Sequence, residues 1–209
     1  AIGSVILQTA VNDMGSTYVA AVSAGSKISM FMCCPFDAMG STMATYGGQN
    51  VGAKRLDRVD QGLKACIKMG IIYALVALAF SIVFGKQLAL LFVKKEQIEL
   101  IGYIYEFVVI NAAFYIFLAL VNIVRFMIQG LGYSTFAILA GICEMIARSV
   151  AGFVLVPHFG FICVSLGSPL AWVCADLFLI PAYLWVIKQL KMKFGGNKIS
   201  RAKSEAATI

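Results

Sequence analysis

The sequence predicts an all-α protein, built as a polytopic bundle of transmembrane helices. Of its 209 residues, 61% are hydrophobic and 13% are charged, and the mean hydropathy is +0.89. A soluble domain has about 25% charged residues and about 45–50% apolar ones. The apolar residues form six long stretches without a period of two, which excludes the strands of a membrane barrel. Helices satisfy their own backbone hydrogen bonds in lipid, so six helices are the interpretation of these stretches.

The six helices are predicted at residues 1–14, 18–46, 61–84, 97–129, 134–156 and 161–190. The first is shorter than the ~20 residues of a spanning helix and lacks the basic flank of a signal peptide. We therefore expect the chain to begin inside a helix, as the C-terminal piece of a longer protein. The second and fourth helices exceed the bilayer and should tilt or bend. In the second, Pro35 and Gly40 are the predicted bend sites.

The net charge is +7, and the position of the basic residues predicts the topology. One group follows the second helix and another lies at the C-terminus: Lys54, Arg55, Arg58, Lys64 and Lys68, then Lys188, Lys191, Lys193, Lys198, Arg201 and Lys203. Both groups lie on the same side of the membrane if the last five helices all cross it. The opposite side carries Lys86, Lys94 and Lys95, diluted by Glu96 and Glu99. The positive-inside rule then places the C-terminus in the cytoplasm of a bacterial inner membrane. Residues 195–209 are predicted to be a disordered basic tail that contacts anionic lipid.

Polar residues within the predicted helices are the candidate functional residues, because such groups are costly in lipid. The predicted substrate or cavity residues are Lys27, Asp37, Asn111, Phe114, Tyr115, Asn122 and Asp176. The charged ones among them can instead snorkel or form structural pairs, and the asparagines can instead bond between helices. The aromatic ones can instead serve only packing. Glu144 and Arg148 stand at i and i+4 on the fifth helix and are predicted to be a structural polar pair.

Catalysis and metal binding have no support in the residue pattern. The six cysteines form no C-x-x-C motif, and the single histidine, His158, follows Pro157 in a turn. A membrane-embedded enzyme acting on lipid would need clustered His, Asp and Glu on facing helices, and one histidine argues against it. Nucleic-acid binding is excluded as well, since no soluble surface remains to carry it. We therefore expect neither an enzyme, nor a cofactor, nor a metal.

Several motifs resemble those of the multidrug and toxic compound extrusion (MATE) transporters. The run PFDAMGSTMATYGGQNVGAKRLDRV ends in a signature similar to that family's Q-N-x-G-A, carried by Gln49, Asn50, Gly52 and Ala53. The stretch FMIQGLGY, with Gly130 and Gly132, resembles its leucine-arginine-glycine-x-glycine run, with Gln129 in place of the arginine. Glu144 and Arg148 match its E-x-x-x-R pair. The similarity reaches to about Phe194 and is greatest for the bacterial branch that includes a staphylococcal multidrug exporter.

The resemblance implies a six-helix lobe, which is half of a twelve-helix transporter. Residues 1–194 would be the C-terminal lobe with a truncated first helix, and the N-terminal lobe of the same transporter would be its partner. Such proteins export cationic and apolar drugs in exchange for H⁺ or Na⁺, as their two lobes rock about a central cavity.

The chain departs from the family where some members bind the cation. The carboxylate that these members carry on the fourth helix of this lobe falls near Leu118 here, which cannot bind a cation. The leading hypothesis is a drug and cation antiporter. The alternative is a related flippase of a lipid-linked or polyprenyl precursor, which would need a wider and more basic cavity.

Overall fold

The computed structural model describes residues 2–206, with side chains described for 5–194, and these residues form a helical bundle. Its elements are α1 (Ile2–Met14), α2 (Ser16–Gly52), α3 (Leu56–Ala89), α4 (Ile98–Ala113), α5 (Tyr115–Gly130), α6 (Ser134–Val150), the π-helical η1 (Ala151–Leu155), α7 (Val156–Phe159) and α8 (Phe161–Ala206). All six predicted helical stretches are therefore helical, and the all-α prediction is confirmed for the described part of the chain.

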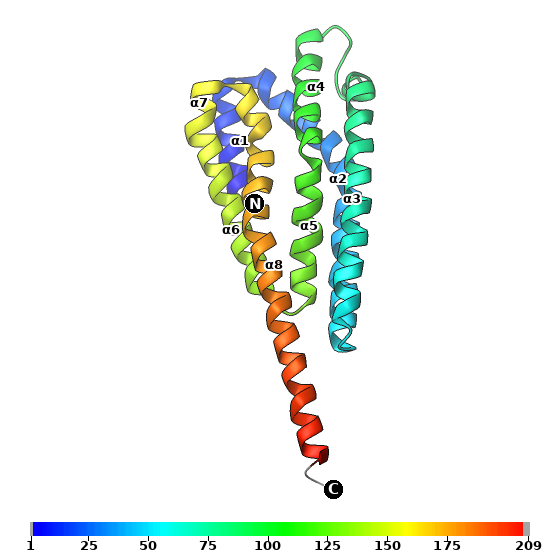
Figure 1. The fold of residues 1–209 in the computed structure, drawn as a ribbon. Coiled ribbons are helices and arrows are strands. Elements are labelled where there is room, and N and C mark those ends of the chain that lie inside the picture. The colour runs from blue at the N-terminus through cyan, green and yellow to red at the C-terminus, as the bar shows by residue number, and fades with distance from the viewer. Residues whose placement is uncertain (1, 207–209) are drawn as a thin grey trace.

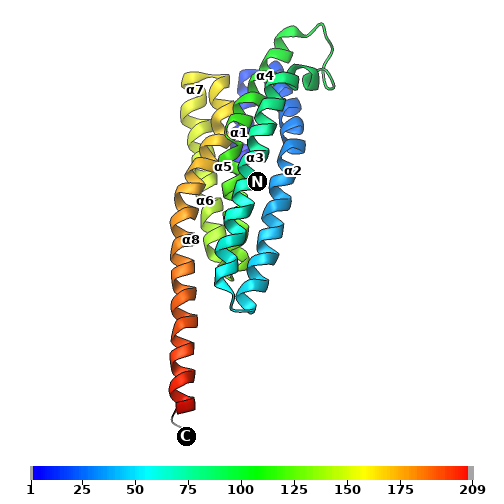
Figure 2. The same cartoon turned by 45° about the vertical axis from the view of Figure 1, so that its right-hand side comes forward.

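The long helices lie side by side and alternate in direction along the chain (Figures 1 and 2). The turn between α2 and α3, the turn between α5 and α6, and the C-terminal part of α8 lie at one end, which we call the basic end. Eight exposed cations stand there: Lys54, Arg55, Arg58, Lys64, Lys68, Lys188, Lys191 and Lys193. The α3–α4 connection and the turn at Gly160 lie at the opposite end. The two basic groups thus share an end, as the sequence predicts.

Within the described residues, four helices are long and apolar enough to cross a membrane: Ser16–Gly52, Leu56–Ala89, Ser134–Phe159 and Phe161–Phe194. The pair α4 and α5 adds a fifth span if it is counted as one. Large apolar side chains cover much of the outer surface, as on α3, where Ile72 is 63% and Val83 62% exposed. Such a surface suits lipid, since a soluble monomer rarely exposes apolar patches of this extent.

The prediction of a single helix at 97–129 is wrong in one respect, because the observed helix breaks at Phe114 into α4 and α5. The axes of α4 and α5 differ by 51°, and the N–H of Phe114 bonds the Asn111 carbonyl at 3.1 Å, in a turn tighter than α-helix. The side chain of Asn111 donates to the Phe107 carbonyl at 2.8 Å and to the Ser165 carbonyl at 3.3 Å. This side chain competes for a helix acceptor just before the break.

The second helix stays continuous through Pro35. Proline has no N–H to bond the Phe31 carbonyl one turn earlier, and Figure 1 shows α2 changing direction along its length. At the other end of the chain, α8 is helical to Ala206, whereas the sequence predicts a disordered tail from residue 195. The side chains of that tail lie outside the described residues, and its disorder stays a prediction.

Two hydrophobic clusters hold the bundle together. The larger unites α2, α3, α5 and α8, with Phe36 and Tyr115 fully buried near its centre. The smaller unites α1, the start of α2, α4 and the start of α8, around Ile104 and Phe107. Burial of each such side chain contributes about 1.5–3 kcal/mol by area in water. In lipid the tight packing itself contributes the larger share of this stabilisation.

Candidate functional site

One face of α2 is both exposed and polar, unlike the lipid-like faces of the other spans. Its exposed polar side chains recur every three or four residues from Cys34 onward, and the set on this face is Ser23, Ser26, Lys27, Cys34, Asp37, Ser41, Thr45 and Gln49. The exposed face of the neighbouring α3 instead carries residues such as Met69, Ile72, Val76 and Val83. Lipid tails cannot hydrogen-bond a polar face, and a charged group there is costly. The α2 polar face, as we call this set, is therefore suited to water or to another protein surface.

Asp37 stands in the middle of this face and is tied to α5. Asn122 is 9% exposed, and its amide donates to the Asp37 Oδ1 at 2.9 Å. The Ser41 hydroxyl bonds the Asp37 backbone carbonyl at 3.0 Å, which satisfies that hydroxyl within the helix. The carboxylate thus keeps one oxygen on α5 and remains open on its other side. The structure brings these two predicted residues together.

Lys27, on the same face, lies apart from Asp37. Ten residues separate them, or about 15 Å along a helix. The Nζ of Lys27 stands 6.0 Å from the centre of the Phe92 ring, beside the α3–α4 connection. Lys27 is therefore at the opposite end of the lobe, where its long side chain can reach water.

A charged cluster lies inside the bundle, between α5 and α6. Glu144 is 8% exposed; it accepts a hydrogen bond from Arg125 of α5 and forms an ion pair with Arg148, whose Nη2 lies 3.3 Å from its Oε2. The i, i+4 pair is present as the sequence predicts, but it has a third member. The sequence does not predict Arg125 as a partner of Glu144. No periodicity links it to Glu144, because the two stand on different helices.

Asp176 is the most isolated polar group of the described interior. It is 4% exposed, and neither of its carboxylate oxygens has a hydrogen-bond partner among the described residues. On α5, which packs against α8, the Nε of Arg125 has no partner among the described residues either. Nearly all buried polar groups are bonded, so this pair needs an explanation.

The remaining predicted cavity residues lie within the lobe. Asn111 is 3% exposed and bonds backbone carbonyls of α4 and α8. Tyr115 is fully buried, with ring centres 5.7 Å from Phe36 and 6.3 Å from Trp172. Phe114 is half-buried at the break. In this structure these three serve helix packing, and their contact with a substrate stays a prediction.

The motif residues shape the basic end of α2 and its contact with α5. A side chain added at Gly130 would collide with the Ala44 carbonyl, so the two backbones touch there. Gly132 has φ +91°, which favours glycine in the turn before α6. Asn50 donates to the Tyr46 carbonyl at 2.8 Å, and its own carbonyl accepts the Arg55 N–H at 2.8 Å.

The other motif residues, Gln49, Gly52 and Ala53, are exposed. Nothing lies within 4 Å of a side chain added at Gly52, so the close approach of backbones is made at Gly48 and Gly130 instead.

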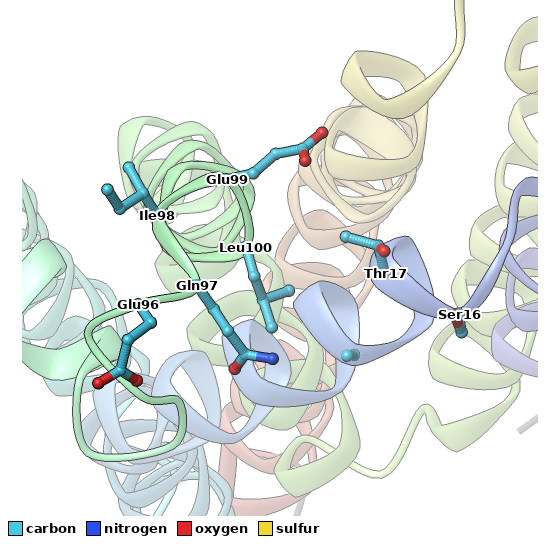
Figure 3. Close-up of a pocket in the computed structure, with 8 residues that line it drawn as sticks. Ser16, Thr17, Glu96, Gln97, Ile98, Glu99 and Leu100 are labelled. Atoms are coloured by element: carbon cyan, nitrogen blue, oxygen red, sulfur yellow. The ribbon is translucent and has the colours of Figure 1, made fainter.

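A pocket of about 560 Å³ opens at the opposite end, between the start of α2 and the start of α4. Ser16, Thr17, Gln97 and Leu100 line it, together with Glu96 and Glu99, whose carboxylates turn to opposite sides (Figure 3). None of the predicted cavity residues lines this pocket. A second, smaller cavity of about 190 Å³ lies within the bundle, where Gln8, Ser26, Arg148 and Ser168 meet apolar side chains of α1, α2 and α4.

Within the described residues, no three His, Cys, Asp or Glu side chains gather as a metal site requires. The interior instead offers carboxylates, amides and guanidinium groups on facing helices. Such an arrangement binds and releases cations or protons, and it can present hydrogen-bond partners to a ligand.

Fold and site together define a polytopic membrane protein with a polar face and an ionised interior. Residues 1–154 match the family model described as MatE. The chain belongs to the MatE family of multi-pass membrane transporters, which confirms the family resemblance. Its branch and the identity of the lobe stay predictions. No curated protein sequence matches the chain.

Solved transporter structures share the fold at low sequence identity. A multidrug resistance MATE transporter of the MOP superfamily superposes in its outward-facing conformation with a TM-score of 0.82 at 20% identity, over 91% of this chain and 43% of that one. The inward-facing conformation of such a transporter gives 0.77 at 19% identity, over 91% and 44%.

A MOP superfamily transporter from Pyrococcus furiosus, described as having a binding pocket of reverse polarity, gives a TM-score of 0.78 at 20% identity, over 91% and 43%. The chain therefore spans less than half the length of the solved structures that it matches.

Proposed function

We propose that this chain is one lobe, the C-terminal one, of a secondary-active antiporter that exports cationic and apolar drugs in exchange for H⁺ or Na⁺. Family membership and the fold support a transporter. The single observation that carries the proposal further is the α2 polar face, because a membrane-length helix exposes serines, a threonine and Asp37 where lipid could not satisfy them. Such a face lines a wet central cavity closed by a second lobe.

The wall of this cavity suits cationic substrates. Along the α2 polar face, Asp37 stands at mid-helix, whereas Lys27 lies at the opposite end beside Phe92. Met30 and Phe31 are 73% and 76% exposed between them. A carboxylate flanked by an aromatic ring and a thioether attracts an apolar cation. A flippase of a lipid-linked precursor would need a basic wall to hold its phosphates, and one end-placed lysine does not supply one.

The two solved conformations that the fold resembles, outward-facing and inward-facing, support alternating access. In this mechanism the lobe moves as a body, and the cavity between the lobes opens to one side of the membrane at a time. Binding of the ion or the drug shifts the population of the two states by its differential affinity for them.

The test is transport by this chain together with the lobe that completes it. In proteoliposomes, uptake of a fluorescent cationic drug should follow an imposed H⁺ or Na⁺ gradient and stop when that gradient collapses. Absence of uptake under either gradient, with folded protein, would overturn the proposal and favour the flippase. Fluorescent lipid-linked precursors would then be assayed.

Neutralising Asp37 should reduce transport without unfolding the lobe. In Asp37→Asn the Asn122 amide faces a neutral group, and a hydrogen bond to a charged group is worth about 1.5–3 kcal/mol. Drug uptake should fall by about tenfold or more. The control is Asp57→Asn, since Asp57 is exposed at the basic end and pairs with Arg55 at 3.3 Å. Equal drug uptake by both variants at equal expression would show that Asp37 is not part of the transport site.

A further inference from the structure

Asp176 stands apart from the α2 polar face, and the cavity wall makes no use of it. It lies on α8, one turn after the buried Trp172, and is 4% exposed without a partner for either oxygen. A buried carboxylate that lacks hydrogen bonds is costly as an anion, and the usual resolution is that it takes up a proton. Asp176 therefore has the surroundings of a protonated group.

The charges around Asp176 are distributed unevenly. Glu144 pairs with two guanidinium groups, those of Arg125 and Arg148, whereas Asp176 has no ion pair or hydrogen bond among the described residues. Arg125 stands on α5, which packs against α8, and its Nε has no partner among the described residues. Of the other helices that pack on α8, α4 contributes the neutral Asn111. The acid of α3, Asp60, bonds Tyr183 and Lys191 about two turns nearer the basic end.

The same four side chains have a second arrangement that differs by one proton. With Asp176 protonated, both arginines remain on Glu144, as in the structure. When the O–H bond of the Asp176 carboxyl breaks and water takes the proton, Arg125 can leave Glu144 for the new carboxylate. Two one-to-one pairs then result, Arg125 with Asp176 and Arg148 with Glu144. Two discrete arrangements of this kind are what a switch requires.

Arg125 is also placed to transmit the change to the cavity wall. It stands three residues after Asn122 on α5, so both side chains lie on neighbouring parts of one helix face. Asn122 bonds Asp37 of the α2 polar face at 2.9 Å. A movement of Arg125 between α6 and α8 would therefore act on α5, and the Asn122 of α5 holds the Asp37 carboxylate of α2.

Water can approach the cluster from the smaller cavity. That cavity, about 190 Å³, is lined by Arg148 together with Gln8, Ser26 and Ser168, which are enough polar partners for ordered water. Glu144 lies one turn of α6 from Arg148. Paired polar groups thus lead from this cavity through Arg148 and Glu144 to Arg125 on α5, and α5 packs against the helix that carries Asp176.

We propose that Asp176 binds the coupling proton and that Arg125 is its exchangeable counter-ion, moving between Glu144 and Asp176 as the proton leaves and returns. This inference rests on the proposed antiport and names its coupling ion and the residue that carries it. Asp176 is the proton-binding group, and Arg125 is a positioning residue that acts through Asn122.

The first experiment needs no drug. Infrared difference spectra of the purified protein between acid and alkaline buffers should show the carbonyl band of a protonated carboxyl that is lost on deprotonation. Asp176→Asn should lack this band, whereas Asp57→Asn should retain it. Asparagine has nearly the shape of aspartate and leaves no unpaired charge, and an unchanged melting temperature would show that the variant is folded. A band that persists unchanged in Asp176→Asn would overturn the proposal.

The second experiment separates this proposal from the antiport itself. In proteoliposomes, Asp176→Asn should lose all uptake of the fluorescent drug that is driven by a proton gradient, whereas Asp57→Asn should keep it. Uptake that remains driven by protons in this variant would overturn the role of Asp176. Uptake driven by Na⁺ alone in the wild type would also overturn it while leaving antiport intact. A wild-type protein that shows the Asp176 band but moves no drug would contradict only the proposed function.

Discussion

Glu144 is the residue on which the buried charges of the lobe depend. It is 8% exposed and forms ion pairs with two arginines, whose side chains are four-fifths buried. Burying an ion pair stabilises a protein little relative to apolar packing, but removing one partner leaves an uncompensated charge. The cluster therefore contributes specificity, because it fixes α5 against α6, and any change that deletes its acid should be severe.

Replacing Glu144 with Gln should destabilise the folded lobe strongly. Arg125 and Arg148 would face each other across a neutral amide, and loss of one partner of a buried pair costs about 3–5 kcal/mol. The melting temperature in detergent should fall well below that of Glu99→Gln, which removes an exposed carboxylate at the opposite end. Equal melting temperatures for the two variants would show that the cluster is hydrated and contributes little to stability.

At this scale the sequence predicts contacts within a helix and misses contacts between helices. The Glu144–Arg148 pair follows from i, i+4 spacing alone. The bond from Asn122 to Asp37 joins residues 85 positions apart, so both were chosen as candidates but not as partners. Arg125 was not a candidate, since its relation to Glu144 depends on how α5 rotates against α6.

At the scale of elements, α2 differs from the other spans because its exposed face is polar over most of its length, with Met30 and Phe31 as exposed apolar residues. Ser41 and Thr45 bond carbonyls four residues earlier on their own helix, which lowers the cost of exposing them. α3, the neighbouring helix of similar length, exposes aliphatic and aromatic side chains instead. The two exposed faces thus suit different surroundings, water or a protein surface for α2 and lipid for α3.

This contrast predicts different reactivity for two introduced cysteines. In the complete transporter without its native cysteines, Ser41→Cys should react with a water-soluble maleimide, because the thiolate that reacts forms in water. Ile72→Cys, at a position 63% exposed on α3, should react far more slowly, since lipid covers it. Labelling is measured by mass spectrometry. Equal rates at the two sites would show that the α2 polar face is not wet.

The break between α4 and α5 could not be predicted from the sequence. Residues 110–118 contain neither glycine nor proline, so the apolar run gives no signal of a bend. The turn forms where Asn111 bonds carbonyls of its own helix and of α8, and that tertiary contact is not visible in a single stretch. The close approach of α2 and α5 at Gly130 is likewise a contact between two helices, and the sequence of neither helix names its partner.

At the scale of the whole molecule, the distribution of charge agrees with the fold. The basic end carries eight exposed cations, and the acids Asp57 and Asp60 there are paired, with Arg55 and with Lys191. The opposite end carries Lys86, Lys94 and Lys95 beside Glu96 and Glu99. Composition and loop charges predict this arrangement because it depends on which helices cross, and not on how they pack. The side chains that would face a second lobe cannot be inferred in the same way.

This asymmetry fixes the orientation that we expect in the membrane. Basic loops stay on the cytoplasmic side, so the α2–α3 turn should be inside and the α3–α4 connection outside. Two exposed lysines are the matched sites, Lys54 in the first and Lys94 in the second. In a cysteine-free background, Lys94→Cys should react with a membrane-impermeant maleimide in intact cells. Lys54→Cys should react only after the cells are opened, and the reverse pattern would invert the lobe and place Asp37 and Asp176 under the opposite gradient.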